Sequence, residues 1–230
     1  MADIITIKFL GTIFLSAVLP TLLWLFFWLR ESRFNPEPPG LLVLTFIAGI
    51  FGVFLVMPVQ SLVTYFGIEG TEKIFIFGLA EEVIKFLTVL VVMGSSSVID
   101  EPIDYAIYLI TGAAGFATAE NVLFMVEPAL NQNISFIVET GTLRFLGASI
   151  LHTVLAALLG LIIGFVFYKS RWVKFRFAIA GIGIVTILHT FFNSFIIKYV
   201  EINGLLTLAI LWLVTLFIIA MFERVRRVTR

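Results

Sequence analysis

The sequence contains no cysteine and few charged residues of either sign. Without cysteine the chain forms no disulfide, no thiolate zinc site and no thiol nucleophile. Charged residues make up 13% of the 230 residues and hydrophobic residues 60%, whereas an average soluble domain is about a quarter charged. Fifteen basic and fifteen acidic residues balance, so we expect no nucleic-acid partner. The composition excludes an ordinary soluble domain and a disordered chain.

Long apolar runs between short polar segments predict an all-α polytopic membrane protein. A helix of about 20 apolar residues crosses the hydrocarbon core, so the chain has room for about seven such spans. Residues 1–230 would then form a single integral-membrane domain. The predicted spans are residues 5–29, 41–66, 74–93, 103–126, 143–168, 177–197 and 205–222. Pro20 and Pro58 are expected to kink the first two spans, and Pro128 to help break the chain after the fourth.

Basic residues near the span ends predict how the protein is oriented in a cell membrane. Lysine and arginine beside membrane spans collect on the cytoplasmic side. If the spans alternate in direction, the basic clusters at residues 30–33, 169–176 and 224–230 all fall on one side. We therefore expect the N-terminus outside and the C-terminus in the cytoplasm.

Ionisable side chains inside the third predicted span point to function, because a charge at mid-membrane costs about 2.5–3.5 kcal/mol on insertion scales. This span holds Glu81, Glu82 and Lys85. At about 100° per residue, Lys85 projects between the two carboxylates. One lysine offsets one carboxylate, so the second carboxyl group is available for acid–base chemistry. A packing ion pair alone explains that second carboxylate poorly.

The next three predicted spans each carry an ionisable residue at a similar depth. Glu120 lies in the fourth span, and the two histidines of the chain, His152 and His189, lie in the fifth and sixth. Like the pair in the third span, each lies about two turns or less from the predicted outer end. Taken singly, Glu120 or His152 also suits a hydrogen-bonded packing residue. Their shared depth predicts one polar intramembrane site between helices three to six, within a catalytic helix core of residues 74–197.

Helical spacing places further residues beside this site. Phe116 lies one turn before Glu120, and Asn193 lies one turn after His189, so each pair shares one helix face. Small residues in the fourth span, Gly112 and Gly115, would let another helix approach closely.

These motifs resemble those of the PrsW family of intramembrane proteases. Residues 81–85, with the letters EEVIK, resemble its EExxK motif, and Phe116 with Glu120 resembles its second motif. Arg144, eight residues before His152, resembles the third element, and His189 with Asn193 the last. The likeness covers residues 81–193, about half the chain. The family is related to type II CAAX prenyl endopeptidases and bacteriocin-processing membrane proteases, which use EExxxR, FxxxH and HxxxN patterns. Position 156, where a polar partner of His152 is expected, is alanine.

The resemblance implies an intramembrane endopeptidase that hydrolyses a peptide bond in or near a transmembrane segment. Its substrate would be a single-span membrane protein, with a regulatory protein such as an anti-sigma factor as one candidate. The catalytic residues would be Glu81, Glu82, Glu120, His152, His189 and Asn193, supported by Lys85, Phe116 and Arg144. Glu81 is the preferred general base toward water. His189 would hold the water or protonate the leaving nitrogen, and the Asn193 amide would donate to the oxyanion.

Several alternatives remain open at the level of sequence. Glu82, Glu120, His152 and His189 offer a tetrahedral zinc set, but no HExxH helix is present, so we favour a metal-free mechanism with no firm cofactor. The sequence does not decide which histidine is catalytic.

Intramembrane charges also suit a proton- or ion-coupled transporter or channel, which would show counter-ion-dependent uptake in liposomes. A catalytically silent membrane scaffold would instead keep its partners when Glu81 is replaced by glutamine.

Overall fold

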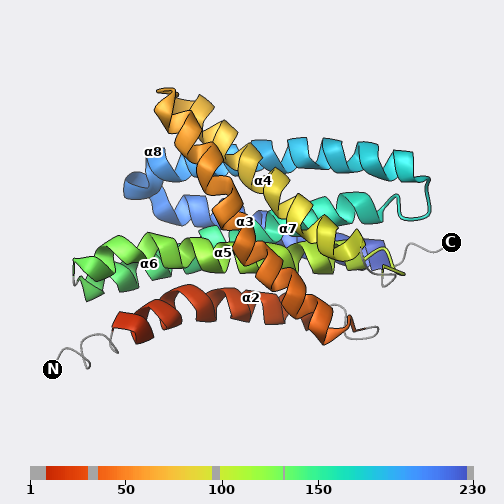
Figure 1. Cartoon of the computed structure of the whole chain (residues 1–230), viewed down its shortest axis with the longest axis horizontal. Helices are drawn as coiled ribbons and strands as arrows, with labels where there is room; N and C mark the ends of the chain where they lie inside the picture. The colour runs from red at the N-terminus through yellow and green to blue at the C-terminus, as the bar shows by residue number, and fades with distance from the viewer. Residues whose placement is uncertain (1–8, 31–35, 95–98, 132, 227–230) are drawn as a thin grey trace.

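The computed structural model describes residues 9–30, 36–94, 99–131 and 133–226, and it is a bundle of helices (Figure 1). Within these ranges no residue lies in a β-strand. The elements in chain order are η1 (Phe14–Val18), α2 (Leu19–Leu29), α3 (Pro39–Tyr65), α4 (Gly70–Gly94), α5 (Asp104–Leu130), α6 (Ile134–Leu146), α7 (Ala148–Gly164) and α8 (Arg171–Arg226).

The lengths and apolar character of the helices agree with a polytopic membrane protein. Five helices among the described residues are long and apolar enough to cross a membrane, and a shorter apolar helix follows them. They are Phe9–Leu29, Pro39–Tyr65, Asp104–Leu130, Ile134–Gly164 and Arg171–Phe195, with Ala209–Phe222 as the shorter one. Helix α4 has 25 residues and is long enough to cross as well, but it carries the charges of the EEVIK motif. The predicted all-α polytopic class is confirmed.

Helices α5 and α7 form the centre of the bundle and pack tightly against each other. Glycine makes the approach close, because a Cβ atom on Gly160 would collide with the backbone of Ala106. Helix α3 crosses α5 obliquely on the other side (Figure 1). At that crossing, a Cβ on Gly115 would collide with the carbonyl of Phe46. The close helix approach expected at Gly115 is therefore present.

Both boundaries of the fifth predicted span differ from those of the helices observed there. Its apolar segment runs from Ile134 to Gly164, and Gly147 divides it into α6 and α7. Helix α6 begins early because the side chain of Asn133 accepts a hydrogen bond from the backbone N–H of Phe136. The break expected at Pro128 is wrong, since α5 continues to Leu130. A proline this near the helix end removes only one backbone donor.

The first predicted span contains a π-helical segment directly before its proline. Element η1 ends at Val18, and Pro20 lies in the first turn of α2. Because proline has no N–H to donate to the carbonyl four residues earlier, the regular hydrogen-bond ladder is interrupted here. Residues 5–8, the beginning of this predicted span, lie outside the described residues.

The sixth and seventh predicted spans belong to one helical element, α8, which doubles back on itself (Figure 1). Its returning part packs on α2: the rings of Trp24 and Trp212 lie 5.5 Å apart, and those of Trp28 and Phe222 5.1 Å apart. The start of η1 and the end of α8 lie at opposite ends of the bundle (Figure 1). This placement fits an odd number of membrane crossings.

Candidate active site

The EEVIK motif lies near the middle of α4, and its three ionisable residues are all buried. The Lys85 ammonium donates a hydrogen bond to Oε1 of Glu82 over 2.6 Å, across one helical turn. Lysine therefore selects Glu82 rather than Glu81 as its ion-pair partner. Gly78, one turn earlier on α4, leaves room for the ring of His189 from α8, because an added Cβ would lie 3.6 Å from its Cγ.

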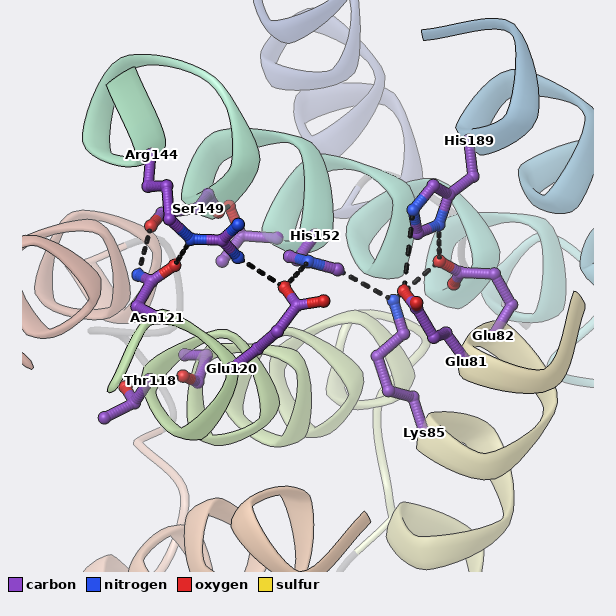
Figure 2. Close-up of polar contacts among 12 residues, drawn as sticks. Glu81, Glu82, Lys85, Thr118, Glu120, Asn121, Arg144, Ser149, His152 and His189 are labelled. Atoms are coloured by element: carbon purple, nitrogen blue, oxygen red, sulfur yellow. Dashed lines mark hydrogen bonds and ion pairs between the residues drawn. The ribbon is translucent and has the colours of Figure 1, made fainter. Parts of the chain in front are cut away.

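His189 joins the two glutamates of α4 (Figure 2). Its Nδ1 lies 2.7 Å from Oε1 of Glu82, and its Nε2 lies 3.5 Å from Oε2 of Glu81. Because Glu82 also accepts from the lysine ammonium, it acts as a carboxylate acceptor for Nδ1–H. The Nε2 atom of His189 then faces Glu81.

His152 from α7 connects the α4 cluster to α5 and α6 (Figure 2). Its Nδ1 lies 3.1 Å from Nζ of Lys85, and its Nε2 lies 3.0 Å from Oε2 of Glu120. An ammonium has protons to donate but no lone pair, so Nδ1 is the acceptor. Nε2 therefore carries the proton of a neutral imidazole and donates it to Glu120. Arg144 donates from Nη2 to the same Glu120 oxygen over 2.5 Å.

Glu81 is the carboxylate whose basic neighbour is a histidine alone, since His189 Nε2 lies 3.5 Å from its Oε2. Glu82 pairs with Lys85 and Glu120 pairs with Arg144, whereas no lysine or arginine among the described residues pairs with Glu81. Its Oε1 accepts a hydrogen bond from Nε2 of Gln60 over 3.1 Å. Its Oε2 is buried without a hydrogen-bond partner in the part of the chain that the structure describes. Of the three acidic groups, Glu81 is thus the one free to engage a water or a substrate.

A cavity of about 690 Å³ lies against this cluster. It is lined by residues of α3, α4, α5, α6, α7 and α8, so α3 contributes in addition to the four spans expected from the sequence. Its polar lining residues are Gln60, Glu81, Glu120, Arg144, His152, His189 and Asn193. Phe116 also lines it and packs against the ring of His152, 5.7 Å away. Glu82 and Lys85 do not line the cavity and lie behind its wall.

The sequence is similar to those of a known protein family. Residues 37–222 match the model of the family described as PrsW family intramembrane metalloprotease. The chain belongs to the PrsW family. The match includes every residue of the cavity and leaves η1 and α2 outside.

Relatives named Protease PrsW occur in three bacteria. The chain is 28% identical over 160 residues to that of Geobacillus kaustophilus, which covers 68% of this chain and 66% of the relative. It is 29% identical over 126 residues to that of Clostridioides difficile, covering 52% of each. It is 25% identical over 160 residues to that of Bacillus subtilis, covering 68% of each. The chain thus matches 52–68% of the length of these relatives. No solved structure matches it significantly.

The PrsW family is described as metalloproteases, and side chains of this site could hold a metal ion. Donor atoms of Glu81, His152 and His189 all lie within 4.8 Å of one another. This group differs from the expected set, since Glu82 and Glu120 instead hydrogen-bond the histidine rings. Two imidazoles and one carboxylate are a donor set that zinc accepts, and carboxylates commonly hold the remaining ring nitrogen of histidine ligands. The residues therefore fit a divalent cation.

Sequence reasoning did not select three polar residues of this PrsW-family site. Gln60 contacts Glu81, and the Asn121 amide contacts both Arg144 and Ser149 (Figure 2). Each is a polar side chain within an apolar helix, the same signal that identified the charged residues. Gln60 and Asn121 carry no net charge, so their burial is less costly and their signal is weaker.

Proposed function

We propose that the chain is an intramembrane endopeptidase that hydrolyses a peptide bond in or beside a transmembrane segment of a single-span membrane protein. The observation that carries this proposal is the state of Glu81. This carboxylate lines the cavity, has no lysine or arginine partner among the described residues and leaves Oε2 without a hydrogen bond. A glutamate placed in this way suits a general base toward water. Membership of the PrsW family supports the same reaction class.

The proposed reaction takes place where Glu81 Oε2 faces His189 Nε2. A water held between Glu81 Oε2 and His189 Nε2, which lie 3.5 Å apart, gives its proton to Glu81. The remaining hydroxide oxygen bonds to the peptide carbonyl carbon. When the carbon–nitrogen bond breaks, that proton passes to the leaving nitrogen and yields an amine and a carboxyl group. Glu82 and Lys85 fix the ring of His189 from behind the cavity wall.

Asn193 would stabilise the transition state. It lines the cavity one turn after His189 on α8. Its side-chain amide has two N–H donors, which suit the oxygen that becomes negative when hydroxide adds to the carbonyl. His189 is the histidine that faces the water, since both ring nitrogens of His152 are already hydrogen-bonded.

In a second version of this mechanism, a bound divalent cation would activate the water. Glu81, His152 and His189 would hold it, and such an ion supplies Lewis-acid activation of water. The ammonium of Lys85 already lies 3.1 Å from His152 Nδ1, which supports the metal-free version. Dialysis of the purified protein against a chelator separates the two. Retained turnover supports the metal-free route, whereas a loss that zinc restores assigns the three residues as ligands.

The proposed cleavage site lies on the outer side of the substrate's span. Lining residues Ile74 and Phe77 precede Glu81 on α4, so the cavity extends from the polar cluster toward the α3–α4 turn. The basic clusters predict that this end of the bundle lies outside. A helical substrate keeps its amides in its own hydrogen bonds, so it must unwind or present a flexible segment next to its span.

The direct test is cleavage of single-span membrane proteins by the purified protein in lipid nanodiscs. We expect Glu81→Gln to lower the rate at least about 100-fold, because glutamine cannot accept the water proton. Glu72→Gln is the matched control, since Glu72 is an exposed acid in the first turn of the same helix. Equal rates for wild type and Glu81→Gln would contradict the proposal. Counter-ion-dependent uptake without cleavage would instead favour a transporter, and binding of partners without either activity a scaffold.

A further inference from the structure

The hydrogen-bonded cluster continues beyond Glu120 to the next residue in the sequence, Asn121, to which the sequence assigned no role (Figure 2). Arg144 contacts two acceptors: Nη2 reaches Glu120, and Nε donates to Oδ1 of Asn121 over 2.5 Å. Both acceptors lie in α5, whereas the arginine comes from α6. The guanidinium is planar, so fixing its Nε also fixes the direction of Nη2. Asn121 therefore sets the direction from which Arg144 meets Glu120.

The Asn121 side chain is itself held firmly. It is fully buried, with 0% of its surface exposed. Its Nδ2 donates to Oγ of Ser149 on α7 over 3.0 Å and to the backbone carbonyl of Ala17 in η1 over 3.5 Å. With Oδ1 on Arg144, the amide oxygen and nitrogen are both engaged and the amide orientation is determined. One side chain thus links α5 to η1, α6 and α7.

We propose that Asn121 is a positioning residue for the reaction: by holding Arg144 on Glu120, it fixes the ring of His152 beside Lys85. This role deepens the proposed function and rests on it. The chain of contacts runs from Asn121 to Arg144, then to Glu120 Oε2, which also accepts from Nε2 of His152. When Arg144 is displaced, Glu120 loses its cation, and His152 Nε2–H loses a fixed acceptor. The imidazole then changes tautomer or hydrogen-bond partner.

The two histidines of the chain allow a test that does not depend on turnover. Protein labelled with ¹⁵N-histidine in nanodiscs gives two sets of ring signals, which a His189→Gln variant assigns. We expect wild-type His152 to show a neutral ring protonated at Nε2. Asn121→Leu is nearly isosteric but offers no acceptor to Arg144, so it should shift the His152 signals. Asn121→Asp keeps an oxygen facing Nε and should largely preserve them.

Thr118→Val is the matched control. Thr118 lies one turn earlier on α5, is buried, and bonds Thr21 of α2 rather than Arg144. We expect it to leave the His152 signals unchanged. Unchanged His152 signals in folded Asn121→Leu would overturn the positioning role. If that variant does not fold, Ser149→Ala removes one of the two acceptors of Nδ2 and should shift the same signals by a smaller amount.

Steady-state kinetics then distinguish a positioning role of Asn121 from a general effect on protein stability. Asn121→Leu should lower kcat about 10- to 100-fold with KM little changed, because small displacements of catalytic groups are costly. Combined with Arg144→Met, it should be no worse than Arg144→Met alone, since both changes break the same contact. Additive losses would overturn the role. If wild-type protein cleaves nothing, the proposed protease function fails, and the histidine signals still decide whether Asn121 positions His152.

Discussion

At the scale of single residues, Lys85 is the cation of a buried ion pair behind the cavity wall. Only 4% of its surface is exposed, and its ammonium contacts both Glu82 and His152. Removing one member of a buried pair leaves the other charged in a medium of low dielectric constant, which typically costs about 3–5 kcal/mol. The stability of the site therefore depends on this lysine even though it does not face the cavity.

We expect Lys85→Met to lower the folded yield and the thermal unfolding temperature in detergent, because Glu82 loses its cation. The measurement is thermal unfolding followed by fluorescence or calorimetry. Lys169→Met, at an exposed lysine in the α7–α8 connection, serves as the control and should behave like wild type. Normal stability and normal turnover of Lys85→Met would rule out the ion-pair role.

Asn193 gives a second prediction at this scale. Asn193→Leu removes the amide donors expected at the oxyanion, so kcat should fall about 100- to 1000-fold while KM changes little. Ser194→Ala is a neighbouring control, since the Ser194 hydroxyl is buried without a partner in the described part of the chain. Steady-state kinetics on one cleavable substrate measure both variants. An equal loss in the two would indicate that α8 is merely disturbed locally.

The ionisable residues around the cavity were predictable from the sequence, but their pairing was not. Glu81, Glu120, His152 and His189 are ionisable residues inside apolar runs, so their burial already predicts a functional role. The choice of Glu82 as the partner of Lys85 depends on the rotation of α4 against α7 and α8. Helical spacing within one segment leaves that rotation open.

At the scale of elements, the crossing of α3 and α5 relies on glycine. A Cβ atom on Gly115 would collide with the backbone carbonyl of Phe46, and backbone cannot move aside as a flexible side chain can. By contrast, a Cβ on Gly183 of α8 would meet no atom within 4 Å. The two glycines lie inside helices of the same bundle but differ in packing.

We therefore expect Gly115→Ala to destabilise the protein by about 1–3 kcal/mol, as overpacking does, and to displace α3 together with Gln60. Gly183→Ala should be neutral or slightly stabilising, because alanine loses less entropy than glycine in a helix. Unfolding temperatures of the two variants in the same detergent check this pair. A Gly115→Ala protein as stable as wild type would show that the helices separate without cost.

The all-α polytopic class followed from the length of the apolar runs, whereas the division of those runs into helices and some boundaries did not. Gly147 interrupts the fifth apolar segment, although a single glycine inside a helical run is usually tolerated. The cap formed by Asn133 also moved the start of α6 ahead of the predicted span. Both effects depend on local hydrogen bonds and on neighbouring helices, which hydropathy does not report.

At the scale of the whole molecule, the absence of cysteine makes the orientation easy to measure. Single cysteines at Thr71, beside the α3–α4 turn, and at Ser170, between α7 and α8, are both exposed and lie on opposite predicted sides. We expect a membrane-impermeant thiol reagent added to intact cells to label Thr71→Cys and to spare Ser170→Cys. The reverse pattern would invert the topology and move the proposed cleavage to the cytoplasmic side.

The contact between α2 and the returning part of α8 has a consequence for biosynthesis. Trp24 and Trp28 of the first apolar helix pack against Trp212 and Phe222, almost two hundred residues later in the sequence. During translation, α2 therefore leaves the ribosome well before its partner in α8. Until Trp212 and Phe222 have been made, the two tryptophans lack these ring partners, so this contact forms only after α2 has been made. A ribosome stalled before Ala209 would hold a chain in which Trp24 and Trp28 still lack Trp212 and Phe222.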